Sequence, residues 1–426
     1  MTPFNYSFWF SNRHGHDEQL CSNDGVAACR NRSLRQNRRV RIVQANAVYD
    51  AAAKTADELL DRYRTLTAWS GAVAGAGATV SVVQRFRTAG RLERGGVTYE
   101  FVADTQPPWL STRGAPEDFI KAIASQSPDV VHVNGLIFPH LIGGIRAAVG
   151  SKVAIVAQHH AGEFPIRGSG IVGLWQRQRW RNGLAAADAI SFTTPEQADQ
   201  WRAAGVLADQ RILAIVEAST TMREVNRERA RMAIGASGDP LILWVGRQTS
   251  NTDPMTILAG LETALPHLPG TQVMMVFGDD TLLEGVEQRV RESELLRPAV
   301  MLSGRISHEE IPNYYSAADV FVSASHSEGS GDALIEAMAV GAVPVVSDIP
   351  MFRAIVGDSG AHFPPGDAGA FATALVRTCS ADLVALKAAT KARFDRWLTW
   401  TALGTRTVAE YQALLDAKRQ GPMRKG

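Results

Sequence analysis

The fold class follows from residues 320–349, VFVSASHSEGSGDALIEAMAVGAVPVVSDI. Val320–Ala324 is an apolar run of strand length, and two glycines mark a turn at residues 328–331. A helical apolar face follows over Ala333–Val340, Gly341 closes the helix, and a proline and two valines begin another buried strand. Strand, tight turn, helix and strand in this order predict a parallel α/β sheet.

The turn at residues 328–331 has the properties of an anion site. A glycine turn that leads from a parallel strand into a helix presents unpaired backbone N–H groups, and the helix dipole favours negative charge there. Gly331 lets the backbone approach a phosphate, and the carboxylates of Glu328 and Glu336 are suited to bind sugar or ribose hydroxyls. The alternative is a solvated helix with two surface glutamates and a turn whose glycines serve geometry alone.

The same residues resemble a known motif. The pattern E-G-x-G-x-x-L-x-E-A-M-A-x-G-x-x-P, which starts at Glu328, is similar to the donor-site motif of the retaining GT-B glycosyltransferases of family 4. The resemblance implies that Glu328 contacts the hydroxyls of the donor sugar and that Glu336 contacts the ribose of its nucleotide. It also implies that the backbone at Ser330 and Gly331 lies against the diphosphate.

Two further segments are similar to this family. Gly246 and Arg247 match a V-G-R segment whose arginine grips the donor diphosphate together with a lysine five residues later, but Thr252 occupies the lysine position. Because charge-assisted bonds to phosphate contribute on the order of 1.5–3 kcal/mol each, this difference should weaken donor binding ~10-fold or more unless another cation compensates. Arg305 and Ile306 correspond to the backbone that pairs with the nucleotide base in the family.

Asp332 places a carboxylate at the start of the helix that should meet phosphate, and capping that helix is its alternative role. The resemblance and the turn together predict a donor-binding set that consists of Gly246, Arg247, Arg305, Ile306, Glu328, Ser330, Gly331, Asp332, Ala333, Leu334 and Glu336.

In the N-terminal half, His160 follows a buried strand, at the sheet edge where open α/β folds bind ligands. The segment is similar to the family's strand-end histidine before a glycine, which implies that His160 holds the donor and acts with Glu328 as a catalytic residue; capping a loop is the alternative. His132, at another strand end, is predicted to pack structurally. The family's glycine-rich loop after the first strand is replaced by Asn46–Asp50, whose tyrosine and aspartate are candidates for acceptor contact.

Composition limits the class of protein. The 426 residues suffice for two domains, and 44 basic against 43 acidic residues argue against a nucleic-acid-binding protein. Three cysteines without metal spacing indicate a reducing compartment. Without an apolar run of transmembrane length or a signal-peptide pattern, a cytoplasmic protein is expected.

Strands and helices alternate from Arg39 onward, with a single long helix expected over Ala56–Val73. This alternation and the resemblance predict the GT-B architecture, two Rossmann-like parallel-sheet domains that face a cleft. The predicted divisions are a disordered extension at 1–38, an acceptor domain at 39–222, a donor domain at 223–396, and a helix at 397–418 that packs back on the acceptor domain. Four aromatic residues are expected to bury against the acceptor domain, namely Phe394, Trp397, Trp400 and Tyr411.

The segment Trp175–Arg181 is basic and aromatic. Such a composition suits a peripheral contact with an anionic bilayer, and a solvated helix with partly buried tryptophans is the favoured alternative.

The predicted function is the transfer of a sugar from a UDP- or GDP-sugar to a hydroxyl acceptor, a saccharide or a lipid-linked saccharide, with retention. Helix amides and Arg247 would stabilise the leaving group, so neither a divalent metal nor another cofactor is required. The remaining hypotheses are a nucleotide-sugar-binding homologue without turnover, a sugar-nucleotide epimerase, and a membrane-associated assembly partner.

Overall fold

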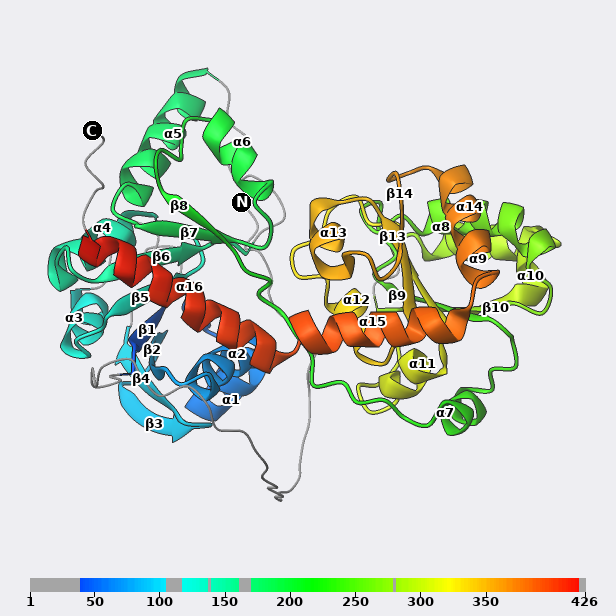
Figure 1. Cartoon of the computed structure of the whole chain (residues 1–426), viewed down its shortest axis with the longest axis horizontal. Helices are drawn as coiled ribbons and strands as arrows, with labels where there is room; N and C mark the ends of the chain where they lie inside the picture. The colour runs from blue at the N-terminus through cyan, green and yellow to red at the C-terminus, as the bar shows by residue number, and fades with distance from the viewer. Residues whose placement is uncertain (1–38, 105–116, 137–138, 161–169, 279–280, 421–426) are drawn as a thin grey trace, which may run out of the picture.

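The computed structural model describes residues 39–104, 117–136, 139–160, 170–278 and 281–420, which form two α/β domains (Figure 1). Each domain is built on its own sheet, and every strand pairing is parallel except one. The prediction of two parallel-sheet α/β domains is confirmed. The predicted disordered extension at 1–38 lies outside the described residues.

The N-terminal sheet has the strand order β3-β4-β2-β1-β5-β6-β7-β8. Its strands are β1 Arg41–Asn46, β2 Thr79–Phe86, β3 Gly90–Arg94, β4 Val97–Ala103, β5 Val130–Asn134, β6 Ala154–Gln158, β7 Ala189–Phe192 and β8 Arg211–Ala214. The sequence did not predict β3, which pairs antiparallel with β4 at the sheet edge and is largely solvent-exposed. A strand without a buried apolar face carries little signal in the sequence.

The C-terminal sheet has the order β11-β10-β9-β12-β13-β14 and is parallel throughout. Its strands are β9 Leu241–Gly246, β10 Gln272–Phe277, β11 Val300–Gly304, β12 Val320–Ser323, β13 Val343–Ser347 and β14 Ala361–Phe363. β9 and β12 pair in the middle of the sheet, so the loops that follow these two strands lie side by side. Such adjacent strand ends are where open α/β sheets bind ligands.

Helices cover both sheets (Figure 1). In the N-terminal domain they are α1 Ala56–Arg62, α2 Arg64–Gly75, α3 Glu117–Ser125, α4 Pro139–Val149, α5 Gly170–Leu184 and α6 Gln197–Ala203. In the C-terminal domain they are α7 Arg227–Ile234, α8 Pro254–Ala264, α9 Leu283–Glu292, α10 Leu296–Ala299, α11 Ile311–Ala317, α12 Asp332–Ala339, α13 Pro350–Val356, α14 Ala368–Cys379 and α15 Leu383–Trp397, and the long α16 Trp400–Gln420 follows them.

The single helix predicted over Ala56–Val73 is wrong, because the chain breaks at Tyr63 between α1 and α2. Arg62 Nη1 and the Tyr63 hydroxyl both donate to Asp50 Oδ2, at 3.1 Å each. The break therefore turns these two side chains toward the loop after β1. It also means that Asp50, a candidate for acceptor contact, already binds two partners within its own domain.

The chain returns to the N-terminal domain through α15 and α16 (Figure 1). Gly404 of α16 lies directly on α2, where a Cβ atom would collide with the carbonyl group of Ala72. The expectation that all four aromatic residues bury against the N-terminal domain is wrong for Phe394 and Trp397, which pack in the C-terminal core. Tyr411 packs in the N-terminal core and Trp400 touches both cores, because the crossing point lies between α15 and α16.

Among the described residues, no single helix is long and apolar enough to cross a bilayer. Only α14 and α15 taken together meet that test, and they are bent by 105° relative to each other.

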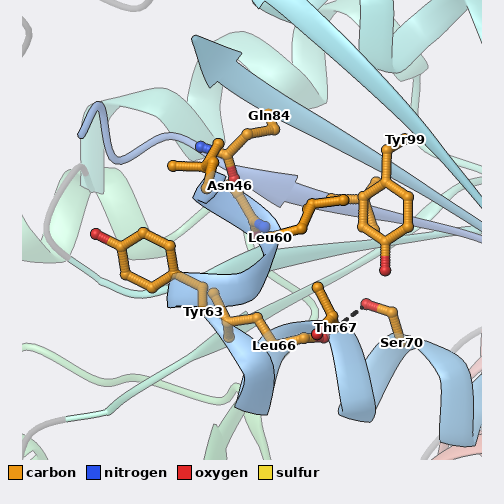
Figure 2. Close-up of a pocket in the computed structure, with 10 residues that line it drawn as sticks. Asn46, Leu60, Tyr63, Leu66, Thr67, Ser70, Gln84 and Tyr99 are labelled. Atoms are coloured by element: carbon orange, nitrogen blue, oxygen red, sulfur yellow. Dashed lines mark hydrogen bonds between the residues drawn. The ribbon is translucent and has the colours of Figure 1, made fainter. Parts of the chain in front are cut away.

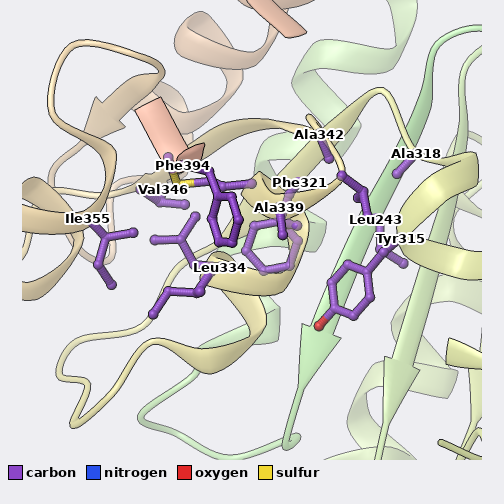
Figure 3. Close-up of a cluster of buried hydrophobic side chains, with 14 of the residues drawn as sticks. Leu243, Tyr315, Ala318, Phe321, Leu334, Ala339, Ala342, Val346, Ile355 and Phe394 are labelled. Atoms are coloured by element: carbon purple, nitrogen blue, oxygen red, sulfur yellow. The ribbon is translucent and has the colours of Figure 1, made fainter. Parts of the chain in front are cut away.

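The helix α12 is held by one of the two hydrophobic cores of the C-terminal domain. Leu334 and Met338 are buried together with Phe321 of β12, Ile355 of α13 and Phe394 of α15 (Figure 3). Burying a side chain of this size contributes roughly 1.5–3 kcal/mol, so the position of α12 is strongly fixed. The turn that precedes α12 is thereby anchored at its C-terminal side.

Candidate functional site

The turn at residues 328–331, here called the glycine turn, ends at a residue that must be glycine. Gly331 is the N-cap of α12 with φ of 70°, and a Cβ atom there would lie 2.6 Å from Ile355 Cδ1. The first hydrogen bond into α12 runs from the Ile335 N–H to the Gly331 carbonyl, at 3.0 Å. The amides of the three residues between them therefore have no partner within the helix, which is the arrangement that binds anions.

The loop between β9 and α8 holds residues 326 and 327, which lead into the glycine turn. Asn251 Nδ2 donates to the Ser327 carbonyl at 2.9 Å, and Asn251 Oδ1 accepts from the Ser327 N–H at 3.1 Å. His326 Nε2 lies 3.0 Å from Asp253 Oδ2. Ser325 Oγ donates to Glu328 Oε1 at 2.8 Å, which fixes the predicted sugar-binding carboxylate.

Arg247 and Thr252 lie in the same loop and differ in accessibility. Thr252 is buried, and its hydroxyl donates to the Arg247 carbonyl, so it closes the loop from inside and does not face the glycine turn as a cation would. The Arg247 side chain is exposed, and its charge acts on Glu328. Of the two cationic positions that the resemblance implies, the chain therefore keeps one.

Three carboxylates around the start of α12 have raised pKa values. For Glu328, Asp332 and Glu336 the main cause is loss of solvation, and the charge of Asp332 adds to the effect at both glutamates. The pKa of Glu336 rises to about 7. The buried hydroxyl of Tyr315, on α11, lies beside Glu336, and burial together with this carboxylate keeps that phenol protonated.

The structure restricts the roles that two members of the predicted set can have. Asp332 is the first residue of α12 and not its cap, since Gly331 occupies the N-cap and no side chain caps the helix. The alternative role of Asp332 as a helix cap is therefore wrong. The Leu334 side chain is 1% exposed and lies in the core, so that only its backbone N–H can face a ligand (Figure 3).

On the N-terminal side of the site, both ring nitrogens of His160 are bonded. Nδ1 bonds a carboxylate oxygen of Glu217, and Nε2 lies 2.6 Å from Asn134 Oδ1. Burial opposes the charged form of His160, but the Glu217 carboxylate outweighs it and raises the pKa of the imidazole. Asn134 ends β5 and His160 follows β6, and Glu217 lies in the segment that leads from β8 to the C-terminal domain.

A line of buried polar groups extends from Glu217 to the crossing helix. Gln158 Nε2 donates to Glu217 Oε2 at 2.8 Å, and Gln158 Oε1 lies 2.7 Å from His132 Nε2. His132 Nδ1 is 2.5 Å from the Tyr411 hydroxyl. His132 is 1% exposed, and burial lowers its pKa to about 3. His132 thus lies inside the N-terminal core, as its predicted structural role requires, and connects α16 to the site.

The two halves of the site meet at the glycine turn. A Cβ atom on Gly329 would lie 3.4 Å from the His160 carbonyl oxygen, and the charge of Glu217 raises the pKa of Asp332. The structure therefore brings His160 next to the turn that carries Glu328, although the two residues are far apart in sequence.

The residues predicted to meet the base lie after β11. Arg305 is exposed, with Nη2 2.6 Å from the Gly278 carbonyl, and Ile306 packs partly against the C-terminal core. Gly246, at the end of β9, lies beside the Trp244 ring. All three occupy carboxyl ends of strands in the C-terminal sheet.

The loop after β1 is held by a buried arginine in place of glycines. The Arg85 side chain is 1% exposed, donates from Nη1 to the Ala47 carbonyl at 2.9 Å and pairs with Asp104. Beside this loop a small cavity of about 10 Å³ has room for roughly one water molecule. It is lined by residues of β1, β2, β4, α1 and α2, and none of the predicted donor residues lines it (Figure 2).

Sequence reasoning missed Glu217, Asn134, Gln158, Tyr411 and Asn251 as parts of the site. Glu217 follows an apolar run, and Asn134 and Gln158 are each the last residue of a strand. The rule that polar residues at carboxyl ends of parallel strands gather at one edge could have found these three. No local signal marks Tyr411.

Two family models match the chain. "Glycosyltransferase Family 4" matches residues 64–215, and "Glycosyl transferases group 1" matches residues 239–381. The two matches cover the two domains in turn, and the second contains the glycine turn and α12.

Individual proteins are similar over different shares of the chain. A GDP-mannose:cellobiosyl-diphosphopolyprenol alpha-mannosyltransferase of Xanthomonas campestris is 27% identical over 301 residues, 70% of this chain and 77% of that protein. A mannosylfructose-phosphate synthase of Agrobacterium fabrum is 31% identical over 140 residues, 31% of this chain and 30% of that protein. Among solved structures, a sucrose-phosphate synthase of Thermosynechococcus elongatus has a TM-score of 0.60 at 20% identity, covering 89% of this chain and 100% of its own. A glycosyltransferase of Rickettsia africae has a TM-score of 0.64 at 15% identity, covering 89% and 99%. These structures are GT-B glycosyltransferases, so the predicted fold is confirmed.

Proposed function

We propose that this chain, which belongs to the family 4 glycosyltransferases of the GT-B fold, transfers a hexosyl group from a GDP- or UDP-sugar to a hydroxyl acceptor with retention. The observation that carries the proposal is the glycine turn. Three helix amides without intrahelical partners stand between Glu328 and Glu336, and His160 lies beside the turn from the other domain. This arrangement suits a diphosphate flanked by two hydroxyl-bearing groups.

In the proposed step, the acceptor oxygen bonds to the anomeric carbon on the face from which the nucleoside diphosphate leaves. The bond between that carbon and the diphosphate oxygen breaks with its electron pair going to the diphosphate, and the acceptor proton passes to a diphosphate oxygen. The amides of α12 and the exposed Arg247 stabilise the charge that develops on the leaving group. We further propose that this stabilisation needs no divalent ion, so transfer should persist in the presence of EDTA.

For the donor we propose GDP-mannose. This assignment is supported by the Xanthomonas campestris relative, a GDP-mannose-dependent mannosyltransferase whose match spans more than two thirds of each chain. Melting midpoints should rise with GDP and GDP-mannose and stay unchanged with ADP. A ligand at 100 times its Kd stabilises the folded state by about 2.7 kcal/mol, which gives a shift of several degrees in a domain of this size.

Two variants test the proposed roles separately. Glu328→Ala should abolish transfer while nucleotide binding stays, because Glu328 is assigned to the sugar, whereas Glu336→Ala should lose nucleotide binding as well. Glu287→Ala is the matched control, since Glu287 is an exposed residue of α9 in the same domain. Undiminished turnover in both site variants would contradict the proposal.

A binding protein without turnover is the second candidate, and two observations favour it. Thr252 uses its hydroxyl inside its own loop, and Asp332 places a carboxylate at the first position of the anion-binding helix. Nucleoside diphosphate released in the presence of an acceptor would exclude this candidate. An epimerase would instead convert the donor without any acceptor.

For the acceptor we propose a lipid-linked saccharide reached at a membrane surface. At the start of α5, Ile171 is 87% exposed, and Val172, Leu174 and Trp175 are 62–64% exposed. Arginines at 177, 179 and 181 are exposed further along the same helix, while Trp180 is partly buried against Trp201. Apolar residues beside arginines suit an anionic bilayer. Co-sedimentation with vesicles that contain anionic lipid, and its loss in Trp175→Ser, would support this contact; equal sedimentation of both proteins would contradict it.

A further inference from the structure

The carboxylates around the glycine turn disfavour the binding of a negatively charged diphosphate unless other groups there carry positive charge. Four carboxylates of the described residues gather there, on Glu217, Glu328, Asp332 and Glu336. The lysine position of the family is Thr252, which is buried and bonded within its loop. Arg247 is one cation of this site, and a second positively charged group is needed to balance the carboxylates.

We propose that Glu217 is a positioning residue that holds His160 with both ring nitrogens protonated, so that His160 stands beside the glycine turn as a cation. The consequence for donor binding rests on the proposed function. The protonation of the ring follows from the directions of the hydrogen bonds together with the neutral states of Tyr411 and His132.

The directions of the hydrogen bonds form one consistent set. Tyr411 remains an O–H donor because burial raises its pKa, so His132 Nδ1 accepts from it. His132 is neutral because burial lowers its pKa to about 3, so its single ring proton is on Nε2 and is donated to Gln158 Oε1.

The Gln158 amide then donates from Nε2 to Glu217 Oε2, so this carboxylate oxygen is an acceptor. His160 Nδ1 faces the same carboxylate and must donate to it. Asn134 Oδ1 is also an acceptor, so Nε2 of His160 must donate as well. With a proton on each nitrogen, the ring of His160 is an imidazolium.

Two groups contact the His160 ring, and a further carboxylate lies near one of them. Glu217 approaches from the interdomain segment, Asn134 from the end of β5, and Asp332 of α12 lies close enough to Glu217 for their charges to interact. His132 lies on the far side of Gln158, and the charge of His160 contributes to lowering its pKa. The His160 side chain is 24% exposed and that of Glu217 is 11% exposed, so the pair is only weakly screened by solvent.

A protonated His160 supplies positive charge that Thr252 does not. Its backbone carbonyl lies against Gly329, so His160 is adjacent to the turn at which the diphosphate sugar should bind. A substrate oxygen can replace Asn134 as the acceptor of the Nε2 proton without any change in the protonation of the ring. Glu217 itself stays behind the ring and acts only through His160.

The first test uses the unaltered protein. Selective ¹⁵N labelling of the histidine rings, with His160→Gln to assign the signals, should show both nitrogens of His160 protonated at pH 7. The midpoint of deprotonation should lie above the ordinary histidine pKa of about 6.5. A single protonated nitrogen at pH 7 would overturn the proposal, whether or not the protein transfers sugar.

The second test uses Glu217→Gln with Glu224→Gln as its control, because Glu224 is exposed in the same interdomain segment. In Glu217→Gln, burial acts without the compensating carboxylate, so the His160 pKa should fall. At pH 7.5 the kcat/KM of Glu217→Gln for the donor should be about tenfold lower than that of the unaltered protein. This difference between the two proteins should shrink toward pH 5.5, where the ring is protonated again.

The two readouts separate the possible failures. An unchanged His160 pKa in Glu217→Gln contradicts the positioning role. A lowered pKa in a protein that shows no transfer with any donor contradicts the proposed function and leaves the positioning role intact. A kcat/KM ratio that does not depend on pH means that Glu217 does not act through the charge of His160.

Discussion

The replacement Glu336→Gln tests the predicted ribose contact in a way that a loss-of-function variant alone cannot. The pKa of Glu336 is raised to about 7, chiefly by burial. The carboxyl group is therefore about one-tenth ionised at pH 6 and about nine-tenths ionised at pH 8. Ribose hydroxyls donate better to the ionised form, so the affinity of the unaltered protein for nucleotide should rise with pH through this range.

The magnitude follows from these fractions. A hydrogen bond to a charged group contributes about 1.5–3 kcal/mol, so glutamine should weaken nucleotide binding about 10–100-fold at pH 8. At pH 6 only about a tenth of the Glu336 carboxyl groups are ionised in the unaltered protein. The ratio of nucleotide affinities between the two proteins should therefore shrink about tenfold.

Stability should change in the opposite sense. The folded-state pKa of Glu336 lies above its unfolded value of about 4.3, so ionisation opposes folding and the stability of the free protein falls as pH rises from about 4 to about 7. Glutamine removes this effect. The free Glu336→Gln protein should therefore melt at a higher temperature than the unaltered protein at pH 8.

Titration calorimetry with GDP at pH 6, 7 and 8 measures the affinities, and scanning fluorimetry measures the melting midpoints. Glu287→Gln is the control for the loss of an exposed charge in the same domain. A difference in affinity that stays constant from pH 6 to pH 8 would refute the reasoning. So would a free Glu336→Gln protein that melts below the unaltered one at pH 8.

Three further changes should act through the fold. Asp104→Asn leaves the guanidinium of Arg85, whose side chain is 1% exposed, without its counter-charge. The free energy of unfolding, measured by urea titration, should fall by about 3–5 kcal/mol. An unchanged free energy would mean that the pair is solvated. Burial opposes the ionisation of Asp319, but the Leu241 N–H together with the charges of Lys387 and an arginine outweighs it and lowers the pKa. The contribution of Asp319 to stability should be complete above the unfolded pKa of about 3.9 and lost as pH falls through the lower folded pKa. Asp319→Asn should therefore make the free energy of unfolding less dependent on pH in the acid range. An unchanged pH dependence would count against this assignment. Gly331→Ala should lower the melting midpoint and remove nucleotide binding, because the residue has φ of 70° and a Cβ atom would lie 2.6 Å from the Ile355 side chain. Normal nucleotide binding by this variant would show that the turn relaxes.

The sequence by itself determined the buried strands other than the short β14, and the turn that leads into α12. The strands of a parallel sheet are buried on both faces, so each one is a continuous apolar run that can be read without knowing its neighbours. The sequence placed Gly331 in the turn before the helix expected over Ala333–Val340, and the structure makes it the N-cap of α12 with φ of 70°. The positions of Glu328 and Glu336 on either side of the helix start follow from the same short segment.

Tertiary structure decided which residues surround that segment. Glu217 and His160 are 57 residues apart, and Tyr411 and His132 are 279 residues apart, yet each pair is in contact. The sequence around Glu217 contains no pattern that names its partner. These contacts depend on the strand order of the N-terminal sheet and on the return of α16 to the first domain, and local residue preferences encode neither.

The charge states of the site were decided at the same level. The carboxylates near α12 have raised pKa values, and His160 has a raised pKa, because the fold removes solvent from them and places specific charges beside them. A sequence gives the type of each ionisable group. Solvation and neighbouring charge, which set the pKa, exist only once the two domains are folded and their strand ends face each other.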